Sequence, residues 1–143
     1  MTQNKLDISQ ATEALKGTRF VEALSLLELN LEKDSNHIDS LYLAAVCSRY
    51  LKNYDDSKKY IQSLLSQSPD MGRAYQELGH LNRDMGNQEN SIAHYRQACE
   101  LNPALLASWK ALYDYFRISK NKPAADHAYM QINTLQSIPS VLL

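Results

Sequence analysis

The chain has 143 residues, of which 44% are hydrophobic, and its formal net charge is −1. This length suits one compact domain or one short array of repeats. The charge is not typical of nucleic-acid binders, whose domains are usually strongly basic. No segment approaches the roughly 20 apolar residues of a membrane-spanning helix, and residues 1–17 lack the apolar core of a signal peptide. We therefore expect a cytoplasmic protein with neither a nucleic-acid nor a membrane partner.

Four segments of the chain align on one another at a spacing of 34 residues. They cover residues 4–37, 38–71, 72–105 and 106–137, and residues 138–143 follow as a tail or as the start of a further segment. Within each segment apolar residues recur at intervals of three and four, which is typical of helices with one buried face. Gly and Pro are scarce, at four each, which favours short connections between helices.

The first segment keeps only part of the shared pattern, namely Ala11, Ala14, Phe20, Ala23 and Leu27. It has polar residues, Asp7 and Gln10, where the other segments have apolar ones. A terminal repeat has one face without a neighbour, so such a departure is expected there. We interpret residues 4–37 as a degenerate capping repeat.

Two sets of positions in the second half of each segment predict how its helices pack. Small residues occupy one set, which consists of Ala23, Ser57, Ser91 and Ala125. Large residues follow four positions later, at Leu27, Ile61, Tyr95 and Tyr129. Small residues also occur in the first helix, at Ala45 and Gly79, so we expect the two helices of a segment to approach closely. Pro69 and Pro103 lack an N–H group and are expected to end the second helix.

This period and helix pairing resemble the tetratricopeptide repeat, whose pattern is W-x2-L-G-x2-Y, then A-x3-F, then P. The third segment matches with Tyr75, Leu78, Gly79, Ser91, Tyr95 and Pro103. The fourth matches with Trp109, Leu112, Phe116, Ala125 and Tyr129, but has Tyr113 in place of the glycine. The resemblance implies an all-α fold, a right-handed solenoid of about four repeats whose first helices line a concave groove.

Members of this family usually bind extended peptides in that groove, and the resemblance places groove positions on the first helix of each segment. The candidate partner-binding residues are Tyr42, Val46, Arg49, Tyr50, Arg73, Gln76, His80, Arg83, Lys110, Asp114 and Arg117, with Asp39, Asp84 and Ile118 at further groove positions. Of the positions that bind chaperone tails in some members, only Arg73 carries a suitable charge. We therefore do not expect a chaperone tail as the partner.

Three of these residues, Arg49, Arg83 and Arg117, share one position of the 34-residue period. Arginine presents a rigid fork of donors that suits carboxylates. The row of arginines therefore predicts a protein or peptide partner with acidic residues or a C-terminal carboxylate. The alternative is that the arginines pair with nearby carboxylates, such as Asp84 and Asp114, or stay solvated.

The sequence gives no sign of catalysis within this chain. It lacks phosphate-binding glycine loops and the G-x-S-x-G motif. Its four histidines and two cysteines, Cys47 and Cys99, do not have the spacing of metal ligands. We expect no catalytic residue, no metal and no cofactor, and the leading hypothesis is a non-catalytic scaffold that binds an extended peptide.

Two alternatives remain open. The stretches LYLAAVCSRYLKNYDDS, PDMGRAYQELGHLNRDMGN and ELNPALLASWKAL resemble the N-terminal repeat region of bacterial tetratricopeptide-repeat sulfotransferase proteins. This resemblance implies a recognition arm of a PAPS-dependent sulfotransferase whose catalytic domain lies beyond residue 143. The other alternative is an adaptor that self-associates through the apolar end of the chain, SIPSVLL.

Overall fold

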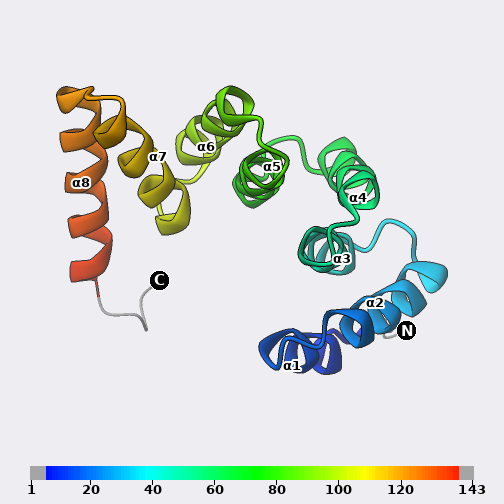
Figure 1. Cartoon of the computed structure of the whole chain (residues 1–143). Helices are drawn as coiled ribbons and strands as arrows, with labels where there is room; N and C mark the ends of the chain where they lie inside the picture. The colour runs from blue at the N-terminus through cyan, green and yellow to red at the C-terminus, as the bar shows by residue number, and fades with distance from the viewer. Residues whose placement is uncertain (1–5, 139–143) are drawn as a thin grey trace. The chain divides into compact units, whose positions relative to one another are not determined.

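The structure is a computed structural model and describes residues 6–138, which fold into α-helices without a strand (Figure 1). The chain divides into two compact units, and the boundary along the chain falls after Pro69. The first unit contains α1 (Ser9–Lys16), α2 (Phe20–Lys33), α3 (Ile38–Tyr50) and α4 (Tyr54–Gln67). The second contains α5 (Gly72–Asp84), α6 (Gln88–Leu101), α7 (Leu106–Ile118) and α8 (Lys122–Ser137). The all-α prediction is confirmed.

Membrane-spanning segments are not found among the described helices, since none of them combines sufficient length with sufficient apolar character.

The same turn ends the first helix of each pair. One residue of each turn has a positive φ angle, and these residues are Thr18 (58°), Lys52 (63°), Gly86 (83°) and Lys120 (61°). In the turn after α3, the Lys52 N–H donates to the Arg49 carbonyl over 2.9 Å and the Asn53 N–H donates to the Ser48 carbonyl over 2.8 Å. This is the Schellman arrangement, which uses carbonyls that the helix end leaves unpaired. The turn reverses the chain so that the second helix returns along the first.

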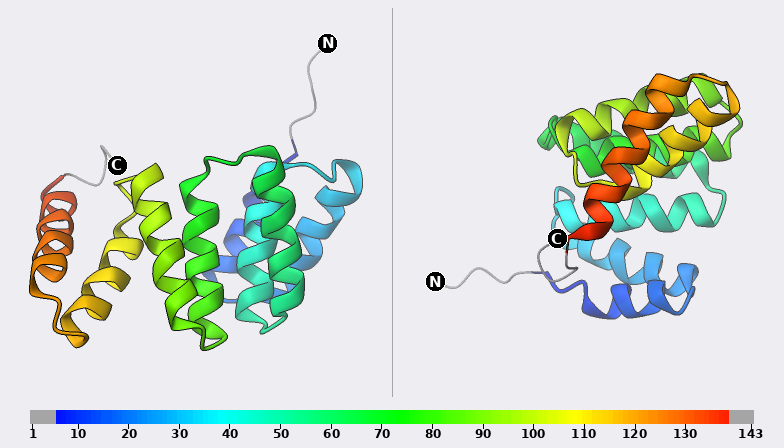
Figure 2. Two further views of the ribbon diagram at one scale, coloured as in Figure 1. Left: turned by 90° about the horizontal axis from the view of Figure 1, so that it is seen from above. Right: turned by 90° about the vertical axis from the view of Figure 1, so that its left-hand side faces the viewer.

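Close packing of α5 on α6 depends on Gly79. The two helices lie side by side in Figure 1 and in the left view of Figure 2. A Cβ atom built on Gly79 would lie 2.7 Å from carbons of the Tyr95 ring, and Tyr95 itself is only 1% exposed. The Ser91 hydroxyl donates to the Gly79 carbonyl over 2.8 Å. The first unit has the same contact, because the Ser57 hydroxyl donates to the Ala45 carbonyl over 2.9 Å.

The pair α7–α8 packs differently, because Tyr113 lies where the preceding pair has glycine. Tyr129 corresponds to Tyr95 in the 34-residue period, yet it is 50% exposed. Its ring centroid lies 5.8 Å from that of Tyr113, with the two planes tilted by 41°. A bulky side chain at position 113 leaves no room for the ring to lie over the helix backbone, so Tyr129 does not join the core as the sequence pattern predicted.

Each unit has its own hydrophobic core. In the first unit the core is built from small and aliphatic residues of α1, α2 and α3, among them Leu27 and Cys47. In the second unit it contains Tyr95, Cys99 and Phe116. Both cysteines are buried, and neither takes part in a disulfide. Burial raises the pKa of the Cys99 thiol to about 12. They act as small apolar residues.

Two polar contacts fix the start of α7 in the second unit. The side-chain oxygen of Gln76, on α5, accepts a hydrogen bond from the Ser108 N–H at 3.1 Å and another from its hydroxyl at 2.7 Å. Trp109 donates its indole N–H to the Pro103 carbonyl over 2.9 Å. Both contacts hold α7 in place relative to the helices that precede it.

Candidate functional site

Four of the predicted partner-binding residues lie on α3 in the first unit. Tyr42 and Val46 are half-buried, Arg49 is 6% exposed and Tyr50 is 53% exposed. The Tyr50 ring stacks on Phe20 of α2, with centroids 4.6 Å apart and planes within 3° of parallel. The Arg49 guanidinium lies 4.5 Å from the centroid of the Tyr50 ring. The end of α3 therefore presents an aromatic stack, and the role of its residues in binding remains a prediction.

The other seven predicted residues lie on α5 and α7 in the second unit. The five exposed ones are Arg73, Arg83, Lys110, Asp114 and Arg117, and the half-buried ones are Gln76 and His80. His80 Nδ1 lies 2.6 Å from the Tyr95 hydroxyl, and the two groups share a hydrogen bond. Since Gln76 binds Ser108 as described above, these two half-buried residues also stabilise the packing of the unit.

Two of the three arginines of the predicted row have carboxylate neighbours on their own helix. Arg83 lies 3.3 Å from Asp84, and Arg117 lies 3.9 Å from Asp114. The side chains of both arginines are more than half exposed, at 53% and 58%. Exposed pairs of this kind contribute roughly 0–1 kcal/mol, so a carboxylate from a partner can replace the intramolecular one at little cost.

A cavity of about 330 Å³ is lined by Arg83 of α5 and Asp114 of α7, among other residues. Its apolar side is formed by Ile92, Tyr95, Tyr115 and Ile118, from α6 and α7. We refer to this space as the Arg83 cavity. Ligand pockets combine an apolar lining with a few polar groups that fix orientation, and the Arg83 cavity has this composition.

Sequence reasoning missed Ile92 and Tyr115 as lining residues. Both belong to the apolar stripes of their helices, which predict a place in the core. Whether a stripe residue is covered or lines a cavity depends on how far apart the helices pack. No motif in the sequence encodes that distance.

Shifted pKa values occur elsewhere in the described part of the chain. Burial lowers the pKa of His94 and raises those of Tyr60 and Cys99. None of these three residues lines the Arg83 cavity. Within residues 6–138 no three His, Cys, Asp or Glu side chains come together in a way that could hold a metal ion. The arrangement at the Arg83 cavity is suited to binding through charge and apolar contact.

Family comparisons match two parts of the chain. The tetratricopeptide repeat family matches residues 72–105, and the coatomer epsilon subunit family matches residues 1–78, more than half of the chain. A search of curated proteins gave no significant match.

Solved structures show the same fold. Residues 41 to the end of MamA from Desulfovibrio magneticus RS-1 align with a TM-score of 0.73 at 16% identity, over 91% of this chain and 73% of that one. Another MamA crystal structure aligns with a TM-score of 0.69 at 13% identity, over 91% and 74%. The C-terminal part of a TPR repeat-containing protein from Cytophaga hutchinsonii aligns with a TM-score of 0.66 at 20% identity, over 88% and 50%. Together with the family match, these likenesses confirm the predicted tetratricopeptide-repeat fold class.

Proposed function

Because this chain belongs to the coatomer epsilon subunit family, whose model matches residues 1–78, and carries a tetratricopeptide-repeat match at residues 72–105, we propose that it is a non-catalytic scaffold that binds a protein partner. Repeat folds of this kind present extended surfaces to their partners. The exposed charged residues of α5 and α7 supply such a surface in the second unit.

The partner that best suits this surface is an extended peptide with acidic residues. The observation that supports it is the position of Arg83 at the edge of an apolar cavity. An apolar side chain of the peptide would enter between Tyr115 and Ile118, and a neighbouring carboxylate would bind Arg83. Hydrogen bonds between guanidinium and carboxylate groups are roughly twice as strong as neutral ones, so Arg83 would select acidic sequences.

Two further hypotheses from the sequence stay predictions. The first is that the chain is the recognition arm of a PAPS-dependent sulfotransferase. The second is self-association through the apolar C-terminal end, and residues 139–143 of that end lie outside the described residues.

Binding of blocked synthetic peptides to the full chain tests the proposal. Each peptide carries one Phe flanked either by Glu or by Lys, and fluorescence anisotropy gives the dissociation constants. We expect the Glu peptide to bind more tightly, and Arg83→Glu to weaken its binding by about 10-fold or more. Lys58→Glu serves as the matched control, because Lys58 is an exposed cation on α4. Equal affinity for the two peptides, or an equal loss in the control, would contradict the proposal.

A second variant tests the apolar side of the Arg83 cavity. Ile118 is 71% exposed, so Ile118→Ser leaves the folded core intact. The variant is expected to weaken binding of a peptide with a central Phe and to leave a peptide with a central Ala unchanged, since only the larger side chain fills the cavity. If both peptides respond alike, the side chain does not bind there.

A further inference from the structure

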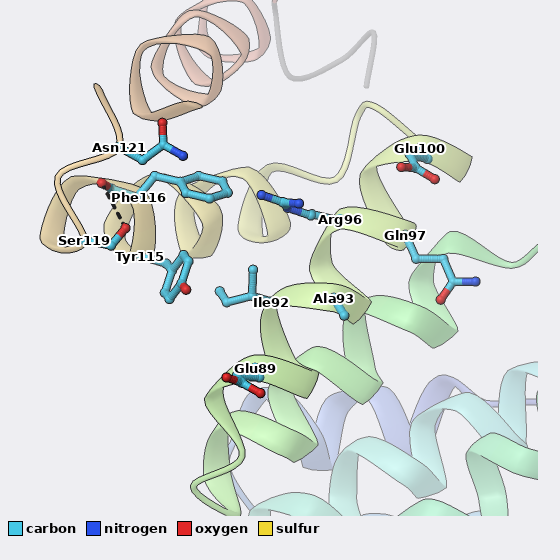
Figure 3. A pocket seen from close by; sticks show the side chains of 10 residues that line it. All are labelled: Glu89, Ile92, Ala93, Arg96, Gln97, Glu100, Tyr115, Phe116, Ser119 and Asn121. Carbon is cyan, nitrogen blue, oxygen red and sulfur yellow. Dashed lines mark hydrogen bonds between the residues drawn. The ribbon is translucent and has the colours of Figure 1, made fainter. Parts of the chain in front are cut away.

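A second and larger cavity, of about 740 Å³, lies between α6 and the C-terminal half of α7. Figure 3 shows its lining, which comes mainly from one face of α6 and from the end of α7. We refer to it as the α6 cavity. None of the eleven predicted partner-binding residues lines it, although it shares Ile92 and Tyr115 with the neighbouring Arg83 cavity.

The cation of the α6 cavity is held by the protein itself. The Arg96 guanidinium lies 4.9 Å from the centroid of the Phe116 ring, and in Figure 3 its side chain extends from α6 toward that ring. Phe116 is only 7% exposed and belongs to the core of the second unit. A guanidinium at this distance from a ring face is attracted to it, so Arg96 serves to join α6 to α7.

The carboxylates of the α6 cavity have no such attachment. Glu89 and Glu100 are exposed, and neither forms an ion pair with another described residue. They lie at the two ends of the lining stretch of α6, eleven residues apart. At about 1.5 Å per residue their positions are separated by about 16 Å along the helix. With two carboxylates and one cation that already contacts a ring, the net charge of the lining is −1.

Between these two carboxylates the lining combines apolar and aromatic groups with the polar side chains of Arg96 and Gln97. Ile92 and Ala93 of α6 face the cavity together with the half-buried ring of Tyr115 on α7. An aromatic ring beside a carboxylate suits the side chain of a basic residue, since the ring face attracts cations and the carboxylate forms an ion pair.

We propose that the α6 cavity is a second protein-binding surface, and that its partner is a basic segment with an apolar residue between two Lys or Arg residues. The partner is opposite in charge to the acidic peptide proposed for the Arg83 cavity. Because the two cavities share Ile92 and Tyr115, the two partners would contact the same apolar residues and differ in the charged groups that they bind.

The spacing of the glutamates sets the spacing of the basic residues. An extended segment rises about 3.3 Å per residue and its side chains alternate between two faces, so two basic residues four positions apart lie on one face about 13 Å apart. Their long side chains cover the remaining distance to Glu89 and Glu100. Their intervening apolar side chain then lies over Ile92 and Ala93. A segment whose basic residues are adjacent reaches only one carboxylate at a time.

Three blocked peptides test this proposal on the full chain. One has two Arg residues four positions apart around a central Leu, one has the same residues with the two Arg adjacent, and one has Glu in place of Arg. We expect the first to bind most tightly by fluorescence anisotropy. Amide chemical-shift changes on its addition should centre on α6 and the end of α7. Equal affinity for all three peptides, or shift changes confined to other helices, would overturn the proposal.

Removal of the carboxylates gives the decisive comparison. The double change Glu89→Gln and Glu100→Gln is expected to weaken binding of the spaced-Arg peptide by roughly 5- to 20-fold, because each exposed ion pair contributes modestly. The matched control is Glu28→Gln with Glu32→Gln, which removes two exposed glutamates from α2. Equal losses in both double variants, or none in the first, would refute the site. Binding of the acidic Phe peptide at the Arg83 cavity should not weaken in either, which separates the two proposals.

Discussion

The ring of Tyr95 lies directly over Gly79, so that a Cβ atom on the glycine would come within 2.7 Å of two ring carbons. Cβ atoms in proteins almost never come so close to another carbon. The Tyr95 ring cannot easily move away, because it is buried and its hydroxyl is hydrogen-bonded to His80. Intrinsic helix propensity favours alanine over glycine by about 1 kcal/mol, but the clash opposes it here. We predict that Gly79→Ala lowers the free energy of unfolding by about 1–3 kcal/mol, as overpacked cores do. Urea denaturation measures the change.

A double-mutant cycle with Tyr95→Leu checks the cause. If the ring is responsible, the cost of Gly79→Ala should shrink in the Tyr95→Leu background, because the clashing atoms are gone. An alanine that stabilises the protein in the native background would contradict the packing described here.

Lys52 and Lys120 occupy turn positions where φ is +63° and +61°. Residues with a Cβ atom pay roughly 1–2 kcal/mol for this conformation, whereas glycine adopts it freely but loses more entropy on folding. We predict that Lys120→Gly raises the free energy of unfolding by about 0.5–1 kcal/mol, measured by urea denaturation. The reverse change at the equivalent position, Gly86→Lys, should destabilise by a similar amount. Stabilisation by both changes would show that φ does not control the effect.

Gln76 contributes the acceptor that links α5 to the start of α7. Gln76→Met keeps the length of the side chain but removes the acceptor, and it leaves the hydroxyl of the fully buried Ser108 without that partner. We expect a loss of about 1–2 kcal/mol in unfolding free energy and faster hydrogen exchange at the amides of the first turn of α7. In a Ser108→Ala background the same change should cost clearly less. Purely additive losses would argue against the contact.

His94 makes stability depend on pH. Its Nδ1 is buried without a hydrogen-bond partner, and burial lowers the pKa of the ring from its ordinary value of 6.5. The unfolded chain therefore takes up a proton at a higher pH than the folded chain does, so unfolding free energy falls as the pH decreases through 6.5. We predict that His94→Phe, which keeps a ring beside Tyr75, flattens the pH dependence between pH 5 and about 7.

The matched control for this prediction is His127→Gln, which removes an exposed histidine from α8. Chemical denaturation at several pH values gives, for each protein, the slope of the unfolding free energy against pH. The prediction fails if the two variants show the same slope.

The fold was largely accessible from the sequence because its information is periodic. The small residues Ser57 and Ser91, together with Ala45 and Gly79, predicted that the helices of a pair lie close together. The structure agrees, because each serine hydroxyl donates a hydrogen bond to a backbone carbonyl of the facing helix. Tyr129 was the exception. Its position follows from the side chain opposite it, Tyr113, and a pattern within one helix does not contain that dependence.

The candidate sites were less accessible, for a related reason. The sequence identified Arg83 and Asp114 as surface residues of first helices, but it could not show that Ile92 and Tyr115 line a cavity beside them. It also could not show that the Arg96 guanidinium contacts the Phe116 ring, whereas Glu89 and Glu100 form no ion pair with another described residue. These features depend on the distance between helices and on side-chain conformation, which are properties of the folded chain.

The turns with positive φ also fix the number of residues that can join the two helices of a pair. Because each turn joins two helices through fixed hydrogen bonds, one inserted residue would rotate the second helix by about 100° about its own axis. Ser91 and Tyr95 would then no longer face Gly79, and polar residues of α6 would take their place. Substitutions are therefore tolerated in these turns far better than insertions or deletions, so protein engineers who wish to extend this molecule should add residues in whole repeats.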